Sequence, residues 1–348
     1  MNPYVLMILL SSLGLGTTLT FASSHWLLAW MGLEINTLAI APLMAQHHHP
    51  RAVEATTKYF LTQATAAAMI LFASTTNAWI SGEWDMSNMS NPAAITMIIT
   101  ALALKIGLAP MHFWMPEVLQ GLDLLTGLIL STWQKLAPLA LIIQLAPTLD
   151  PLVLTSLGIM SALAGGWGGL NQTQLRKILA YSSIAHMGWM IIVLQYAPQL
   201  TTLALGTYIF MTSAAFLTLK SSSATKINAL AMTWSNSPIL TATTALVLLS
   251  LGGLPPLTGF MPKWLILQEL TKQDLPIAAT VMALAALLSL YFYLRLCYAM
   301  TLTISPNTAN STTPWRMQTT QTSLPLTIST TISLGLLPMT PAILMLVT

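Results

Sequence analysis

Long apolar segments separated by short polar ones make up almost the whole chain. Each segment is close to the roughly 20 residues that an α-helix needs to cross a bilayer. The pattern predicts an all-α polytopic membrane protein with about eleven spans and little chain outside the membrane. We place the spans at residues 3–21, 25–45, 56–80, 92–118, 123–147, 149–171, 174–196, 199–220, 238–271, 275–303 and 323–347.

The fourth predicted span contains residues that an uninterrupted membrane helix would avoid. Residues 104–116 read L-K-I-G-L-A-P-M-H-F-W-M-P. Pro110 cannot donate a hydrogen bond to the carbonyl of Ile106, and it disfavours helical backbone at Ala109. We therefore expect this helix to break. Broken backbone at membrane depth is tolerated only where protein covers it or where it lines a polar cavity.

The ninth predicted span repeats this pattern at a constant offset along the chain. The matched pairs are Gly107 with Gly253, Leu108 with Leu254, Pro110 with Pro256, Met115 with Met261 and Pro116 with Pro262, while Phe260 replaces Trp114. Five helices separate the mates, and because five is odd we expect the second repeat to be inverted. Two broken helices in corresponding halves indicate an ion pathway.

This pattern predicts a single transporter-like membrane domain over residues 1–348. Its inverted five-helix repeats would cover about 1–147 and 149–303, and each repeat would contain one broken helix. An additional C-terminal helix is expected at about 323–347.

Composition supports the membrane assignment and narrows the chemistry. The chain is 55% hydrophobic and 6% charged, whereas soluble domains carry about 25% charged residues. The net charge of +3 is small and scattered, so no nucleic-acid partner is expected. The single cysteine, Cys297, excludes an internal disulfide and a thiolate metal cluster. No phosphate-binding loop, dinucleotide fingerprint or haem ligand pair is present, so we expect this chain to bind no cofactor or metal.

Charged residues in the predicted loops differ between the two sides of the membrane. The side of the N-terminus collects Arg51, Lys58, Arg176, Lys177, Lys226 and Arg316, and the opposite side has Lys272, Glu83, Asp85 and Asp150. Because basic loops stay on the cytoplasmic side or its organellar equivalent, the N-terminus is predicted to face that side and the C-terminus the other.

Four ionisable residues lie well inside predicted spans: Glu34, Lys105, Lys135 and Lys263. Insertion scales give a cost of roughly 2.5–3.5 kcal/mol for a lysine at the centre of a membrane helix. Each could be an ion pair buried for packing, but three lysines outnumber one glutamate, so pairing alone cannot neutralise them. Because desolvation disfavours the charged ammonium, such lysines can exchange protons near neutral pH. We therefore predict that these four residues form a proton relay.

Two histidines are weaker candidates for the same relay. His112 lies in the first predicted break, and His186 lies in the seventh predicted span. Imidazole titrates near pH 6.5, so each could pass protons through water. Each could equally be a core histidine with a structural hydrogen bond.

Four longer motifs carry a resemblance to a known family. They are A-L-K-I-G-L-A-P-M-H-F-W-M-P-E at 103–117, S-T-W-Q-K-L-A-P at 131–138, N-Q-T-Q-L-R-K-I-L-A-Y-S-S-I-A-H-M-G-W at 171–189 and L-G-G-L-P-P-L-T-G-F-M-P-K-W at 251–264. On these motifs the chain resembles the antiporter-like subunits of mitochondrial NADH–ubiquinone oxidoreductase (respiratory complex I), in a vertebrate form. The resemblance covers essentially the whole chain.

The resemblance implies a role for each intramembrane residue. Glu34 would pair with Lys105 of the first broken helix, Lys135 would be the central connecting lysine, and Lys263 would belong to the second broken helix. Together they would form part of a hydrophilic axis along which ubiquinone reduction elsewhere in the complex drives proton translocation.

The resemblance also implies a setting. The chain would be a subunit of the proton-translocating NADH:ubiquinone reductase in the mitochondrial inner membrane, with its N-terminus on the matrix side and its C-terminus on the intermembrane-space side. The rest of the complex would use NADH, FMN, iron–sulfur clusters and ubiquinone. The partners would be other antiporter-like and small membrane subunits, accessory subunits and lipids such as cardiolipin.

Two alternatives remain open at this point. A free-standing cation/proton antiporter would need no electron-transfer partner, and a structural spacer of the membrane arm would need no titrating lysines. The intramembrane lysines argue against the spacer.

Overall fold

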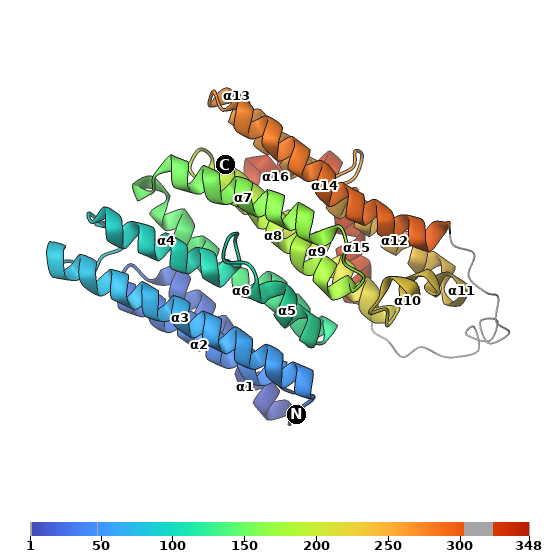
Figure 1. Ribbon diagram of the computed structural model, residues 1–348, viewed down its shortest axis with the longest axis horizontal. Helices are drawn as coiled ribbons and strands as arrows, with labels where there is room; N and C mark the ends of the chain where they lie inside the picture. Colours follow the sequence, from blue (N-terminus) through green and yellow to red (C-terminus); the bar gives the residue numbers. More distant parts are fainter. Residues whose placement is uncertain (1, 47, 303–322, 348) are drawn as a thin grey trace. The chain divides into compact units, whose positions relative to one another are not determined.

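The computed structural model describes residues 2–46, 48–302 and 323–347, and the helices follow the chain from blue to red in Figure 1. In these ranges the regular structure is helical apart from two isolated β-bridges. The contacts divide the chain into two compact units, Met1–Ser161 and Ala162–Thr348. The predicted all-α class is confirmed.

The first unit contains the following elements: α1 (Pro3–Ala22), α2 (Trp26–Met44), α3 (Pro50–Ser81), α4 (Pro92–Ile106), α5 (Trp114–Gly121), α6 (Leu124–Leu145), η1 (Ala146–Thr148) and the first part of α7 (Pro151–Gly169). Helix α1 packs on α2, α3 packs on α2, α4 and α5, and α6 packs on α1, α2 and α4. Three helices, α1, α2 and α4, thus surround the side chains that α6 presents to the interior.

The second unit contains the end of α7 followed by these elements: α8 (Leu175–Val193), α9 (Pro198–Ser221), α10 (Ile227–Ala231), α11 (Thr233–Asn236), α12 (Pro238–Gly252), α13 (Phe260–Lys272), α14 (Pro276–Thr301), α15 (Leu324–Gly335), η4 (Leu337–Met339) and α16 (Thr340–Val347). Helix α8 packs on α9, α13 and α14 and is the buried helix of this unit, with every residue from Ser182 to Leu194 buried. A helix that is shielded all round can carry polar side chains, as α8 does.

Local sequence explains where many helices begin. Proline occupies the first position of several of them, where its missing N–H has no intrahelical partner to lose. Side-chain acceptors complete these caps: Asn2, His25, His49 and Asn91 each accept from a backbone N–H two residues later.

Both predicted breaks are confirmed. Helix α4 ends at Ile106 and α12 ends at Gly252, and each is followed by a glycine in the left-handed region, Gly107 at φ 84° and Gly253 at φ 80°. Glycine adopts this conformation without a steric penalty. The chain then turns through a proline-containing loop and resumes as α5 or α13. The inverted relation between the two repeats stays a prediction.

Each of the eleven predicted spans is helical, although the lengths differ. Six helices in the described part of the chain are long and apolar enough to cross a membrane, and the count is seven if the bent pair α15 and α16 is one span. Of the other four predicted spans, two are divided by the breaks. The remaining two, α3 and α8, contain polar side chains that lower their mean hydropathy too far for them to be counted as spans. The last predicted span is bent by 68° rather than straight.

Candidate functional site

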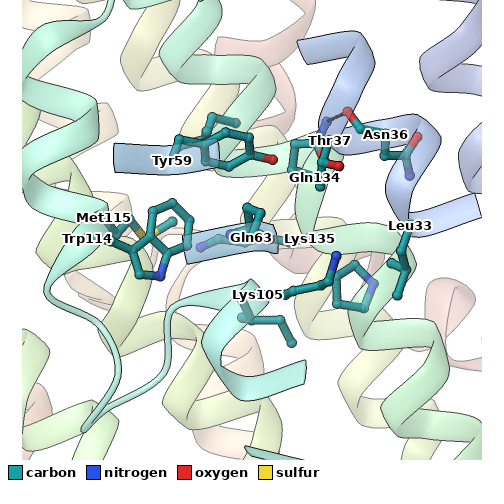
Figure 2. Close-up of a pocket in the computed structure, with 13 residues that line it drawn as sticks. Leu33, Asn36, Thr37, Tyr59, Gln63, Lys105, Trp114, Met115, Gln134 and Lys135 are labelled. Carbon is teal, nitrogen blue, oxygen red and sulfur yellow. Dashed lines mark hydrogen bonds between the residues drawn. The ribbon is translucent and has the colours of Figure 1, made fainter. Parts of the chain in front are cut away.

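A polar cavity inside the first unit brings together two of the predicted lysines (Figure 2). Its lining residues come from α2, α3, α4, α5 and α6, and they are Leu33, Asn36, Thr37, Tyr59, Gln63, Lys105, Ile106, Trp114, Met115, Leu130, Gln134, Lys135 and Pro138. Lys105 is 5% exposed and Lys135 is 2% exposed, so both ammonium groups are shielded from bulk water and lipid. The break in α4 thus opens onto a buried polar space.

Three buried polar atoms around this cavity lack a hydrogen-bond partner in the described structure. They are Lys105 Nζ, Asn36 Oδ1 and Gln63 Nε2. Buried polar groups are normally paired with protein or ordered water, and leaving one unpaired costs about 1–3 kcal/mol. Two donors and one acceptor around the same cavity form a site in which ordered water can make the missing hydrogen bonds.

Helix α6 adds a further polar group beside Lys135. Pro138 lies inside this helix, and because it has no N–H it leaves the carbonyl of Gln134 without its usual intrahelical donor. The Gln134 side chain extends to α2, where its Nε2 donates to the backbone oxygen of Asn36 at 3.3 Å. Gln134 thus ties α6 to α2 next to Lys135 at the wall of the cavity.

Glu34 lies on α2 near the same cavity but does not line it. Its carboxylate accepts a hydrogen bond from Thr37 Oγ1 at 2.9 Å. Its charge acts on both Lys105 and Tyr59. Within the ranges that the structure describes, no ion pair shorter than 4 Å joins Glu34 to Lys105. The implied pairing is thus a through-space influence in this conformation.

The end of α4 is held by the helix that follows the break. Trp114 Nε1 donates to the carbonyl of Leu104 at 3.0 Å, and the Trp114 ring contacts the Tyr59 ring at 5.8 Å between centroids. His112 lies in the same loop, buried, stacked on Phe113 and hydrogen-bonded to the backbone of Pro110. It belongs to the break rather than to the cavity lining.

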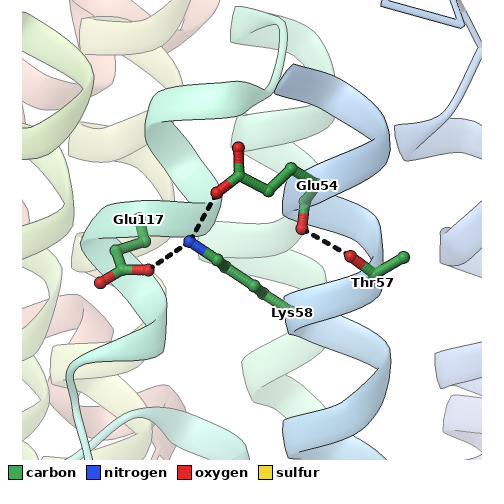
Figure 3. Close-up of polar contacts among 4 residues, drawn as sticks. All are labelled: Glu54, Thr57, Lys58 and Glu117. Carbon is green, nitrogen blue, oxygen red and sulfur yellow. Dashed lines mark hydrogen bonds and ion pairs between the residues drawn. The ribbon is translucent and has the colours of Figure 1, made fainter. Parts of the chain in front are cut away.

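An ion-pair cluster joins α5 to α3 at the surface (Figure 3). Lys58 Nζ lies 2.8 Å from Glu54 Oε1 and 2.8 Å from Glu117 Oε2. The hydrogen bond from Lys58 holds the pKa of the Glu54 carboxyl below its ordinary value. Such exposed pairs contribute little to stability, about 0–1 kcal/mol. Their effect is to fasten the short helix after the break to its neighbour.

The second unit places Lys263 and His186 together. Both residues line two adjoining cavities, one of which also includes Ser182, Ser289 and Tyr293. Lys263 is 8% exposed, and its Nζ donates to the carbonyl of Gly252, the last residue of α12, at 2.7 Å. A cation is favoured there because the carbonyl end of a helix carries partial negative charge.

Several polar residues of these cavities were not predicted from the sequence. They are Asn36, Tyr59, Gln63 and Gln134 in the first unit and Tyr293 in the second. Beside the second set, the Tyr208 ring lies 5.6 Å from the His186 ring. Tyr208 hydrogen-bonds to Ser183 of α8, whereas the buried hydroxyl of Tyr293 has no hydrogen-bond partner in the described part of the chain. Asn36, Gln63 and Gln134 could have been identified from the sequence, because an amide side chain inside an apolar span needs a buried hydrogen-bond partner.

Comparison with known proteins agrees with this geometry. The family model described as "NADH:quinone oxidoreductase/Mrp antiporter, TM" matches residues 23–289, and the model of the "NADH dehydrogenase subunit 2 C-terminus" matches residues 290–344. The chain is 86% identical to "NADH-ubiquinone oxidoreductase chain 2" of Carassius auratus over 348 residues, and 81% identical to that of Danio rerio over 348 residues. Both alignments cover 100% of each chain.

Solved structures share the fold. A chain of "Respiratory complex I from Thermus thermophilus with bound Aureothin" superposes with a TM-score of 0.87 at 28% identity, covering 99% of this chain and 80% of that one. A chain of the Mrp complex from Dietzia sp. gives 0.86 at 14% identity, covering 97% and 76%, and shows the fold alone. The chain therefore belongs to the NADH:quinone oxidoreductase/Mrp antiporter transmembrane family, in the branch of the NADH–ubiquinone oxidoreductase chain 2 proteins.

Proposed function

We propose that this chain moves protons across the mitochondrial inner membrane as a multi-pass membrane subunit of NADH–ubiquinone oxidoreductase. The observation that carries this proposal is the buried polar cavity of the first unit, which Lys105 of the broken helix α4 and Lys135 of α6 line together. A structural spacer has no need of such a cavity, since a buried ammonium group destabilises the fold unless it is compensated.

The cavity supports a proton relay by electrostatics. Two ammonium groups that line one buried space repel each other, so a proton on Lys105 favours release from Lys135, and the reverse. The negative charge of Glu34 favours the charged form of Lys105. A change in the position or charge of Glu34 therefore shifts the proton between the two lysines.

The second unit supplies a separate set of groups for the same task. Lys263 and His186 line shared cavities, and the hydroxyls of Ser182 and Ser289 lie beside them. Hydroxyl and imidazole groups both donate and accept, so they can pass a proton to or from the lysine. His112, buried in the first break, is a further candidate.

Electron transfer belongs to other subunits in this proposal. NADH, FMN, iron–sulfur clusters and ubiquinone would be used by the rest of the complex, and this chain would respond to ubiquinone reduction through its charged residues. Its neighbours would be other antiporter-like, small membrane and accessory subunits, with lipids such as cardiolipin at the exposed apolar surface.

Native electrophoresis of mild-detergent extracts tests the assembly. We expect an antibody against this chain to stain the same band as in-gel NADH dehydrogenase activity. The reason is that the chain is 86% identical over its full length to the NADH-ubiquinone oxidoreductase chain 2 of Carassius auratus. A free-standing antiporter would instead run as a small species without NADH oxidation, and that result would overturn the proposal.

The orientation is proposed from the charged loops. Arg176 and Lys177 open α8, and Lys226 precedes α10 on the same side, while Arg316 lies outside the described residues. We expect the 171–177 loop to face the matrix. Trypsin added to mitoplasts, whose outer membrane has been removed, should leave this loop intact and should cut it only after detergent is added. Cleavage from the outside in sealed mitoplasts would reverse the assignment.

A further inference from the structure

The end of α4 is closed by a side chain from the other side of the break. Gly107 N–H donates to the carbonyls of Ala103 and Leu104, and Leu108 N–H donates to Ala103. The indole N–H of Trp114 then adds a second donor to the Leu104 carbonyl at 3.0 Å. These donors satisfy the carbonyl groups that a helix end otherwise leaves exposed.

The second break has no tryptophan at the matching position. Phe260 occupies the position that matches Trp114 and has no hydrogen to donate. There the terminal carbonyl, that of Gly252, is taken by the ammonium of Lys263 at 2.7 Å. The two carbonyls are not equivalent positions, because Leu104 matches Ser250 and Gly252 matches Ile106. At each break, however, a side chain from beyond the break donates to a carbonyl in the last turn of the helix.

The lysines differ accordingly. Lys263 is bound to the end of its broken helix, whereas the ammonium of Lys105 has no hydrogen-bond partner in the described structure and faces the cavity. Lys105 also lies in the last turn of α4, where the partial negative charge of the helix end attracts a cation. Without the indole, the Leu104 carbonyl would keep only the Gly107 donor at 3.2 Å, and its remaining acceptor capacity would compete with the cavity for this ammonium group.

We propose that Trp114 is a positioning residue for Lys105: by donating its indole N–H to the end of α4, it keeps the lysine ammonium directed into the cavity. The inference rests on the proposed proton-relay function of Lys105. Its surroundings support the role, because Trp114 is 8% exposed, lines the same cavity and is fixed against Tyr59.

Two replacements of Trp114 distinguish a role as hydrogen-bond donor from a role as space filler. Each role predicts the opposite order of proton transport for the two variants. Trp114→Phe keeps an apolar ring and removes the donor, while Trp114→Gln keeps an N–H donor and removes the ring. We expect Trp114→Phe to lower NADH-driven proton uptake by reconstituted vesicles about tenfold, the change that about 1.4 kcal/mol produces. Trp114→Gln should retain several times more transport than Trp114→Phe. If Trp114 only fills space, Phe will outperform Gln.

A double-mutant cycle with Lys105→Met shows whether the effect passes through the lysine. We expect Trp114→Phe to reduce transport no further once Lys105 is methionine, because coupled sites are non-additive. Trp79→Phe, a tryptophan replacement at a 91% exposed position of α3, is the matched control and should leave transport unchanged.

The outcomes separate this inference from the function on which it rests. If Lys105→Met leaves transport intact, the relay role of Lys105 fails. If Lys105→Met lowers transport but the Trp114→Phe effect is absent or simply additive, the positioning role alone is overturned. Should Trp114→Phe not assemble, the Gln variant decides: transport near the wild-type level supports the donor role, and loss as severe as that of Lys105→Met refutes it.

Discussion

Lys135→Met in the assembled oxidoreductase is expected to slow proton transport about 100-fold while the complex still assembles. Methionine keeps the long apolar stem and removes the ammonium, so the change in packing is small. Without a group that binds the proton, charge must cross the buried region unaided, at roughly 2.5–3.5 kcal/mol, and each 1.36 kcal/mol is a factor of ten in rate. The measurement is NADH oxidation with quinone, recorded together with proton uptake in sealed vesicles.

The two other buried lysines provide graded comparisons. Lys105→Met should also impair transport and should destabilise the complex, because removal of the lysine leaves the Glu34 carboxylate without its favourable charge. Adding Glu34→Gln should then partly restore assembly. Lys263→Met should assemble less well, since it removes the donor to the Gly252 carbonyl. Lys220→Met, at an exposed position in the last turn of α9, is the control. Normal turnover and normal proton-to-electron ratios in all three buried variants would reduce the chain to a spacer.

The broken helices could be predicted from sequence because their cause is local. Proline removes a donor at a fixed position, and glycine supplies the left-handed residue that ends the helix, so Gly107 and Gly253 take almost the same backbone conformation. Ionisable residues in apolar segments are equally visible, since each carries a large desolvation cost wherever it packs. All three predicted lysines are indeed buried.

The partners of those residues could not be predicted in the same way. The Trp114 hydrogen bond to Leu104 spans the break, so it depends on how α5 folds back on α4. Sequence spacing does not specify that angle. Glu34 illustrates the same limit, because a side chain on α2 and one on α4 meet only through the packing of whole helices. The position of His186 shows the same limit, because only the packing of α8 on α13 brings it to the cavities that Lys263 lines.

Gly253→Ala is expected to lower both the thermal stability of the complex and its proton transport. The residue has φ 80°, where a side chain strains the backbone by roughly 1–2 kcal/mol. A Cβ atom there would also lie 2.9 Å from both Cδ and Nζ of Lys263. Because such contacts are too short, the lysine must move away from the Gly252 carbonyl that it now binds. We expect a transport loss of about tenfold, the change that about 1.4 kcal/mol produces, because the lysine is displaced from its carbonyl. The backbone strain lowers the thermal stability.

Gly107→Ala separates backbone strain from displacement of the lysine. Gly107 has φ 84°, but its nearest neighbours are Met115 Sδ at 3.3 Å and Trp114 Cζ2 at 3.5 Å, so no lysine is pushed aside. Gly107→Ala should therefore lower the melting temperature about as much as Gly253→Ala does. Its loss of proton transport should be smaller. Gly206→Ala, in α9 with no atom within 4 Å of the new Cβ, should change neither quantity. Equal transport losses in the Gly107 and Gly253 variants would show that strain alone, and not the contact with Lys263, determines the effect.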